Sequence, residues 1–286
     1  MPSSPTVASW ELGSRLRAKR ELLGLRSSVV VKNLGMSVQF LSAVEHGKKK
    51  LPMDKLDALI RVYEVDADEA VELRALREAA GLRGWWSQFS ALFSEELLRM
   101  FGLEHGAESV RAFDNGLMNG LLQTEDYARA IIEAGSPNVR LAEVDRRVRA
   151  RMIRQRRLTG EEPLQLTAVM SESTIHQQVG GPAVLADQLR HLLDLVDTHA
   201  DTLDLRIVPF TATGHHAMGG SSFNLMTFPS SFLGTLVWQE TVTSTELIED
   251  DLTVREYSLA YAEVCKSALS QQESVDLIRQ AAKKLE

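Results

Sequence analysis

Residues 35–47 read Gly-Met-Ser-Val-Gln-Phe-Leu-Ser-Ala-Val-Glu-His-Gly, and they decide the fold of the N-terminal part of the chain. Gly35 can adopt the positive φ angle that closes one helix, and the Ser37 hydroxyl can cap the next helix. Leu41 and Val44 lie three residues apart, so they share one helical face and point inward. The pattern predicts the turn and the second helix of a helix-turn-helix.

The residues on both sides of this stretch support the same prediction. Val30, Val31 and Leu34 form an apolar helical face just before the turn, and Gly47 can end the second helix. The first turn of the second helix is polar, and such a helix fits the major groove of DNA with its N-terminal residues at the base edges. A small helical bundle with solvated basic side chains is the alternative, but it rarely combines all of these features.

The charge distribution also distinguishes this region. Residues 14–50 contain nine Lys and Arg residues against Glu21 and Glu45, a net charge of +7, whereas the whole chain carries −7. The remaining 249 residues therefore carry −14. The basic residues that precede the motif on the first helix are Arg15, Arg17, Lys19 and Arg20. A basic region on an acidic protein is typical of a surface that contacts DNA phosphates.

The predicted DNA-binding residues divide by their chemistry. Gln39 can pair with adenine through its amide, and Val38 and Phe40 can contact a thymine methyl group. Phe40 has packing against the protein as an equal alternative. Ser42 lies one helical turn after Val38, so it can reach a base or a phosphate. Contacts with the DNA backbone are predicted for Ser27, Ser37, Lys48, Lys49 and Lys50.

Double-stranded DNA is thus the expected partner, and the geometry of DNA predicts an oligomeric state. One helix-turn-helix covers only a few base pairs, so specific binding normally uses two copies about one helical turn of DNA apart. We therefore expect a homodimer on a pseudo-palindromic site. No cofactor is expected.

Length and composition limit the remaining possibilities. A chain of 286 residues favours two domains. Cys265 is the only cysteine, so no intrachain disulfide can form, which suits a reducing cytoplasm. No apolar stretch reaches the length of a membrane span, so we expect no membrane partner. Residues 1–10 lack the basic start and apolar centre of a secretion signal, and we expect a short disordered tail there.

The apolar periodicity predicts a five-helix, helix-turn-helix domain over residues 11–80. The helices are expected at residues 12–23, 27–34 and 38–46, then after Pro52 and after the capping residue Asp66. Gly81 and Gly84 mark the end of this domain.

The larger part, residues 85–286, has a mixed pattern that predicts an α+β domain. Its apolar residues from Trp85 to Phe101 suggest one helix that packs in the core, or else forms a dimer face or the junction with the N-terminal domain. Further helices are expected at 139–158, after Gly180-Gly181-Pro182, and from about 250 to the end. Alternation predicts strands at residues 164–169, 204–208, 222–228 and 235–239. The last three strands follow closely, so we expect an antiparallel meander, in a chain that is mainly α overall.

Seven arginines crowd the helix expected at residues 139–158. They are Arg146, Arg147, Arg149, Arg151, Arg154, Arg156 and Arg157. A solvated face paired with carboxylates is one interpretation, and a site for an acidic partner, a ligand or flanking DNA is the other. The adjacent His215 and His216 have no acidic or cysteine ligand near them in sequence, and no catalytic motif is present. We therefore expect neither a metal site nor enzymatic activity.

The N-terminal part resembles the phage-repressor-type helix-turn-helix family, sometimes called Xre-like. The larger part carries short phrases in a specific order. They are Gly120 to Arg129, Arg151 with Arg154-Gln155, Glu172 before Gly180-Gly181-Pro182, Val208-Pro209-Phe210 with Gly214-His215, and Ala268-Leu269-Ser270 with Glu273-Ser274. Together these resemble actinobacterial helix-turn-helix regulators whose C-terminal half is a domain of unknown function, often described as antitoxin-like. The resemblance covers nearly the whole chain.

The resemblance implies a transcriptional regulator, often encoded beside a small acidic partner protein. On this basis Gln123, Arg151, Arg154 and Gln155 are candidates for contacting a partner or a ligand. We therefore expect a sequence-specific DNA-binding regulator that acts as a cytoplasmic homodimer and is modulated through its C-terminal domain. The alternative is an antitoxin-like module whose main role is to bind the small acidic partner protein.

Overall fold

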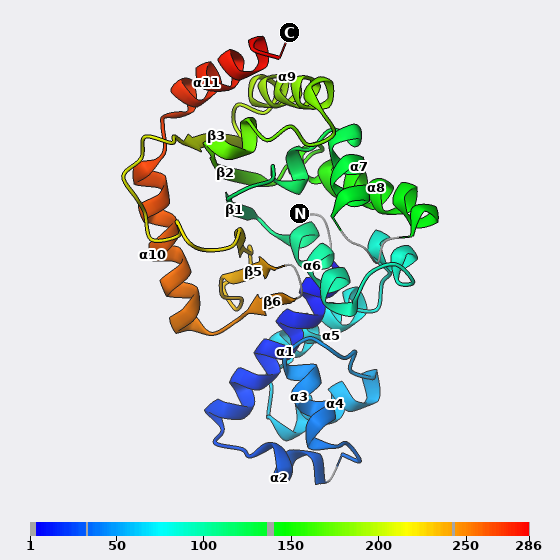
Figure 1. Cartoon of the computed structure of the whole chain (residues 1–286). Helices are drawn as coiled ribbons and strands as arrows, with labels where there is room; N and C mark the ends of the chain where they lie inside the picture. The colour runs from blue at the N-terminus through cyan, green and yellow to red at the C-terminus, as the bar shows by residue number, and fades with distance from the viewer. Residues whose placement is uncertain (1–3, 33, 136–139, 242–243, 286) are drawn as a thin grey trace. The chain divides into compact units, whose positions relative to one another are not determined.

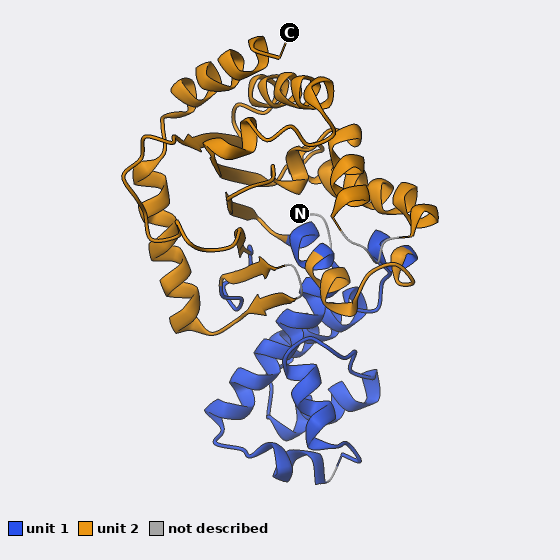
Figure 2. Ribbon diagram, in the orientation of Figure 1, with its two compact units in different colours: residues 1–88, 101–106, 228–234 blue, residues 89–100, 107–227, 235–286 orange. Residues whose placement is uncertain are grey.

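The computed structural model describes residues 4–32, 34–135, 140–241 and 244–285. The chain divides into two compact units (Figure 2). The first unit combines residues 1–88 with the later segments 101–106 and 228–234, and the second unit contains residues 89–100, 107–227 and 235–286. Helices predominate and one sheet is present, which confirms the mainly α fold class with a smaller α+β part.

Five α-helices form the main body of the first unit (Figure 1). They are α1 (Pro5–Leu22), α2 (Ser27–Lys32), α3 (Val38–Glu45), α4 (Met53–Val62) and α5 (Ala67–Ala79). Leu16, Leu41 and Leu56 are fully buried in one apolar cluster to which all five helices contribute. The five helices confirm the prediction from apolar periodicity.

The expectation of a disordered N-terminal tail is wrong for residues 4–10, because helix α1 covers most of this segment. The Ser4 hydroxyl donates a hydrogen bond to the Gly102 carbonyl oxygen at 2.6 Å. Trp10 is buried, and its ring meets the Phe228 ring edge-on with the centroids 5.1 Å apart. Burial of apolar surface against residues far along the chain orders this segment, and local sequence patterns do not reveal such contacts.

Helices α1 and α3 approach so closely that only glycine fits at two positions. A Cβ atom on Gly13 would lie 2.1 Å from the Val44 carbonyl oxygen. A Cβ atom on Gly47 would lie 2.5 Å from the Trp10 Cα atom, and the φ angle of Gly47 is +65°. Backbone contact therefore fixes the end of α3 against α1.

A six-stranded sheet flanked by helices forms the second unit. The strands are β1 (Ser109–Asp114), β2 (Gln165–Ser171), β3 (Leu203–Val208), β4 (Phe223–Thr227), β5 (Leu236–Glu240) and β6 (Thr245–Ile248). The α-helices are α6 (Glu95–Gly106), α7 (Glu125–Ala134), α8 (Leu141–Gln155), α9 (Pro182–Thr198), α10 (Asp251–Ser267) and α11 (Gln271–Lys283). The second half of α6 belongs to the first unit.

The sheet is mixed, with strand order β3-β2-β1-β4-β5-β6. Strands β1, β2 and β3 are parallel, with Ala112 beside Ala168 and Ala168 beside Leu205. Strands β4, β5 and β6 continue from β1 in antiparallel ladders. The expected antiparallel pairing is confirmed for β4 and β5, but the meander that includes residues 204–208 is wrong. Strand β3 lies beside β2 instead, since α9 supplies the crossover that parallel strands require.

Three further elements differ from the sequence-based expectation. The alternation pattern does not predict β1, which mixes Arg111 and Asp114 with apolar residues, or β6, which has four residues. The apolar run from Trp85 to Phe101 is not one helix, because a 3₁₀ helix ends at Phe89 and α6 begins at Glu95. Residues 90–94, Ser-Ala-Leu-Phe-Ser, form a turn and a bend between the two helices.

Asp114 ends β1 with a buried carboxyl group. Its side chain accepts a hydrogen bond at Oδ2 from the Asn119 amide nitrogen, at 3.2 Å. Burial raises the pKa of Asp114 to about 7, against the opposing effect of the Asn119 hydrogen bond. The ordinary value is 3.8, so the folded state holds the Asp114 proton over a pH range in which the unfolded chain has lost it.

Alanine at Gly47 should destabilise the first unit more than alanine at Gly24. Both glycines have a φ angle near +65°, but a Cβ atom at Gly24 would meet no atom within 4 Å. We expect Gly24→Ala to cost about 1–2 kcal/mol, from the left-handed backbone alone. Gly47→Ala adds the collision with Trp10 and should cost roughly 3 kcal/mol or more. Urea unfolding of both variants measures the difference, and equal losses would contradict the close contact.

The buried carboxyl group predicts a specific dependence of stability on pH. Because the folded-state pKa of Asp114 is the higher one, its carboxyl group favours the unfolded state progressively as pH rises from about 4 to about 7. Asp114→Asn should therefore gain roughly 2–4 kcal/mol relative to the wild type between pH 4 and pH 8. Urea unfolding across this range measures it, with the exposed Asp126→Asn as control. Parallel pH curves for wild type and Asp114→Asn would refute the prediction.

Candidate nucleic-acid interface

The turn between α2 and α3 has the geometry that the sequence predicts. Gly35 has a φ angle of +58°, and the Ser37 Oγ atom accepts a hydrogen bond from the Phe40 backbone N–H at 3.0 Å. Leu41 and Val44 are buried in the core of the first unit. The helix-turn-helix is therefore confirmed, and one face of α3 is fixed inward.

The opposite face of α3 is open to solvent. Gln39 and Ser42 are exposed, as is Ser37 at the cap, and 41% of Val38 is exposed. Phe40 is only partly exposed, because it packs against the apolar cluster of the first unit. Of the four residues on α3 that could contact a base, Phe40 is thus the one that packs most against the protein itself.

Three lysines follow α3 directly. Lys48, Lys49 and Lys50 are exposed, and among the residues that the structure describes they form no ion pair. The backbone N–H groups of Lys48 and Lys49 both donate to the Ala43 carbonyl oxygen, at 2.8 and 3.2 Å. These bonds hold the start of the lysine segment against the end of α3. Ser27, the other candidate for phosphate contact, is half-buried at the first position of α2.

The basic residues of α1 are already engaged within the first unit. Arg15 lies 2.6 Å from Glu72, and Lys19 lies 3.0 Å from Glu69, both acidic residues being on α5. The positive charge counted over residues 14–50 is therefore partly neutralised by the fold. The lysines after α3 carry a larger share of the charge available to a phosphate than the sequence count suggests.

Arg20 forms an ion pair that positions the end of α3. Its Nε and Nη2 atoms donate to the two carboxylate oxygens of the buried Glu45, at 2.6 and 2.9 Å. Arg20 also donates to the Leu25 carbonyl oxygen at 3.1 Å. The hydrogen bond with Glu45 raises the pKa of the Arg20 guanidinium group. Glu45 is thus a structural residue, whereas Arg20 is a positioning residue that the sequence analysis assigned only to a basic surface.

In the second unit, Gln123, Arg151 and Gln155 meet in one hydrogen-bond network. The buried Gln123 donates to the Met118 carbonyl oxygen at 2.7 Å and accepts from Arg151 at 2.7 Å. Gln155 donates to the carbonyl oxygens of Gly120 and Gln123, at 3.1 and 2.7 Å. The structure therefore brings together three of the four candidate partner-binding residues. Their hydrogen bonds to backbone carbonyl oxygens hold the segment between β1 and α7 in place.

Gln188 is a member of this polar region that the sequence interpretation missed. It is fully buried on α9, accepts from the Thr124 backbone N–H at 2.7 Å and donates to the Leu122 carbonyl oxygen at 2.8 Å. A polar residue next to Leu189 in an apolar helical stripe is the signal that could have revealed it. Arg154, the fourth candidate, is buried in α8.

The arginines near α8 divide into two groups. Arg147 pairs with Glu143 at 3.1 Å, in agreement with a face paired with carboxylates. Arg146, Arg149 and Arg156 are exposed and make no ion pair with any residue that the structure describes. Each of the two interpretations of the arginine-rich helix therefore fits some of its members.

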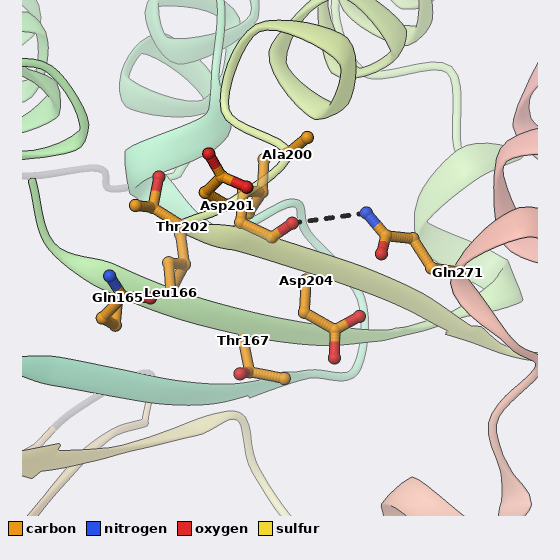
Figure 3. A pocket seen from close by; sticks show the side chains of 9 residues that line it. Gln165, Leu166, Thr167, Ala200, Asp201, Thr202, Asp204 and Gln271 are labelled. Carbon is orange, nitrogen blue, oxygen red and sulfur yellow. Dashed lines mark hydrogen bonds between the residues drawn. The ribbon is translucent and has the colours of Figure 1, made fainter.

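A polar cavity of about 270 Å³ lies at the amino ends of β2 and β3 (Figure 3). Gln165, Thr167 and Asp201 line it, together with Gln271, which donates to the Leu203 carbonyl oxygen at 3.3 Å. None of the site residues predicted from the sequence lines this cavity.

Within the described residues, no helix is both long and apolar enough to cross a membrane. A family model for a helix-turn-helix domain matches residues 11–73, and a family model for a domain of unknown function, DUF5753, matches residues 97–280. No curated protein and no solved structure matches the chain. The predicted combination of an N-terminal helix-turn-helix with a C-terminal domain of unknown function is thus confirmed. Since the second match spans more than half of the chain, the protein belongs to the DUF5753 family and carries a helix-turn-helix domain at its N-terminus.

Proposed function

We propose that this protein is a sequence-specific DNA-binding transcriptional regulator of the Xre-like type, with α3 as its recognition helix. The observation that supports this best is the solvent-exposed face of α3 with Gln39 and Ser42, which the turn at Gly35 and the Ser37 cap present, followed by the three exposed lysines. In a helix-turn-helix, such a helix enters the major groove with its N-terminal residues at the base edges. We place this activity in the cytoplasm, where bacterial DNA lies, and we expect no enzymatic activity.

The side chains of α3 have distinct roles in the proposal. Gln39 reads a base, because its amide both donates and accepts and can pair with the adenine edge. Val38 gives apolar contact to a thymine methyl group, and Ser42 contacts a base or a phosphate one turn later. Phe40 contributes mainly through its packing, which holds the exposed residues in place.

The phosphate contacts come from both ends of the motif. The Ser27 and Ser37 hydroxyl groups and the N–H groups at the helix starts can donate to phosphate oxygens. Lys48, Lys49 and Lys50 add the positive charge that makes binding depend on salt. These contacts orient α3 in the groove, whereas the base contacts select the sequence.

We further infer that the regulator binds DNA as a homodimer, because one recognition helix reads too few base pairs for useful specificity. The second unit, which belongs to a family without an assigned function, would then modulate binding. The actinobacterial origin that the sequence resemblance implies is part of the same proposal.

An antitoxin-like role, in which the chain mainly binds a small acidic partner protein, is the second candidate. The exposed Arg146, Arg149 and Arg156 favour it, because they lack carboxylate partners among the described residues. Gln123, Arg151, Arg154 and Gln155 are the further candidates for contact with such a partner, on the basis of the sequence resemblance. The two functions are compatible, and a small acidic protein that copurifies with wild type but not with Arg146→Glu/Arg149→Glu would favour the second.

Selection of bound fragments from a random DNA pool tests the proposed function and the role of Gln39. We expect the wild type to select one pseudo-palindromic sequence, and Gln39→Ala to lose about 1–3 kcal/mol on it and relax the preference at one position of each half-site. Gln280→Ala, on an exposed position of α11, is the matched control. If the wild type selects no common sequence, the regulator proposal fails, and if Gln39→Ala selects an unchanged sequence, Gln39 is not a base reader.

Removal of two lysines after α3 should change the salt dependence of binding rather than its sequence preference. For Lys48→Ala/Lys49→Ala, we expect the slope of log affinity against log salt to fall by about two, roughly one for each lost phosphate contact. Fluorescence anisotropy on the selected DNA at several salt concentrations measures this slope. Lys283→Ala/Lys284→Ala removes the same charge at the C-terminal end and should leave it unchanged, so an equal effect of both pairs would rule out a local phosphate contact.

A further inference from the structure

Lys55 occupies a position of α4 at which helices usually avoid positive charge. It is the third residue of α4, and the helix dipole makes acidic residues favourable in this first turn. Pro52, the N-cap residue of α4, makes no side-chain hydrogen bond to that turn. Neither the dipole nor the cap of α4 explains the lysine. A residue that breaks a local rule often serves a contact elsewhere in the fold.

The ammonium group of Lys55 extends from α4 to the turn of the helix-turn-helix. Its Nζ atom donates a hydrogen bond to the Leu34 carbonyl oxygen at 2.6 Å. Leu34 lies between α2 and Gly35, the residue whose positive φ angle turns the chain towards α3. The Nζ atom also lies 3.8 Å from the point that a Cβ atom on Gly35 would occupy. Lys55 therefore adjoins the turn directly.

The chain just after α2 is a favourable place for this cation. Carbonyl groups at the C-terminal end of a helix lack partners within the helix and carry the partial negative charge of its dipole. The Leu34 N–H group donates to the Val31 carbonyl oxygen at 3.1 Å, and Lys55 donates to the Leu34 carbonyl oxygen that follows. A hydrogen bond from an ammonium group is roughly twice as strong as a neutral one. Lys55 thus acts as a charged cap at the end of α2.

The other surroundings of Lys55 leave its ammonium group to this contact. Leu56, the next residue of α4, is fully buried in the apolar cluster of the first unit, so the backbone at Lys55 is fixed by the core. Asp57 on the same helix pairs with Arg74 of α5 at 2.9 Å. Lys55 is partly buried and forms no ion pair with any residue that the structure describes. Its side chain therefore links the core to the turn.

We propose that Lys55 is a positioning residue for DNA binding, which holds the turn at Leu34 and Gly35 and so sets the orientation in which α3 presents Gln39. This inference rests on the proposed function and deepens it. Helix α2 has six residues and α3 has eight, so their relative orientation must come from tertiary contacts. Arg20 holds the C-terminal end of α3, and Lys55 holds the turn before its N-terminal end. A turn that is already ordered in the free protein loses less conformational freedom when DNA binds.

Loss of the Lys55 ammonium group should weaken DNA binding without changing its salt dependence. Lys55→Met keeps an unbranched side chain of similar length and removes the charge. On the DNA that the wild type selects, fluorescence anisotropy should show binding about tenfold weaker at each salt concentration, the effect of one lost charge-assisted hydrogen bond. The slope of log affinity against log salt should stay at the wild-type value, since Lys55 contacts no phosphate in the proposal.

Two further variants make this measurement specific. Lys55→Arg keeps a charged donor and should regain most of the lost affinity. Arg61→Met removes the same charge from an exposed position of α4 and should bind like the wild type. A slope that falls by about one for Lys55→Met would show that Lys55 contacts a phosphate, and the positioning role would then be wrong. Wild-type affinity of Lys55→Met would overturn it as well.

Amide hydrogen exchange on the full chain without DNA tests the contact itself. The Leu34 and Phe40 N–H groups make hydrogen bonds on the two sides of the turn, to the Val31 carbonyl oxygen and to Ser37 Oγ. In Lys55→Met both should exchange roughly tenfold faster or more, because the turn opens more often. The amide of the buried Leu16 on α1 should keep its wild-type rate. Equal acceleration at Leu16 would indicate a general loss of stability and would overturn the positioning role.

These measurements separate the inference from the proposed function. If the wild type selects no DNA sequence, the regulator proposal fails, whereas faster exchange confined to the turn still shows that Lys55 holds it. If the wild type selects a sequence and Lys55→Met binds and exchanges like the wild type, the regulator proposal stands and the inference about Lys55 fails.

Discussion

The proposed DNA-binding surface depends on the contact between α1 and the end of α3. Two glycines, Gly13 and Gly47, allow the backbones to touch, and the Arg20–Glu45 ion pair closes the same junction with hydrogen bonds of 2.6 and 2.9 Å. A recognition helix of eight residues has little stability of its own, so its orientation comes from such packing. The buried Glu45 carboxylate is acceptable there only because Arg20 neutralises it. The junction therefore fixes the angle at which Gln39 and its neighbours meet solvent.

The helix-turn-helix could be predicted from the sequence because its signals are local. Gly35 and Ser37 act on their own backbone or on residues within three positions, and the positive φ angle of Gly47 is likewise a local signal for the end of α3, although its close contact with Trp10 is not local. The sequence could not reveal the Arg20–Glu45 pair or the burial of Trp10, since both join residues that are distant along the chain. The acidic partners of Arg15 and Lys19 on α5 are also distant in sequence, so a count of charges over residues 14–50 overestimates the positive charge that α1 can offer to DNA.

In the second unit, too, features that depend on neighbouring residues could be predicted from the sequence, and features that depend on distant residues could not. Strands β4 and β5 alternate clearly and are joined by a short connection, so their pairing could be predicted. The closeness of β3 to β4 in sequence favours an antiparallel pair, but β3 pairs with β2, because the helix α9 between β2 and β3 forms the crossover of a parallel pair. Gln123 and Gln155 were identified by resemblance, but their contact with the backbone of the loop before α7 emerges only from the folded chain.

The first unit also contains residues 228–234, which lie far along the sequence from its five helices. This segment connects β4 to β5. Phe228 follows the last residue of β4 and rests against Trp10, whose backbone in turn touches Gly47 behind the recognition helix. Residues from two distant parts of the sequence therefore pack behind the recognition helix within the first unit. The chain passes between the two units several times. A single proteolytic cut therefore cannot separate either unit from the other intact. Transplanting residues 11–80 into another protein would therefore leave Trp10 and Phe228, and with them the packing behind Gly47, out of the transplanted segment.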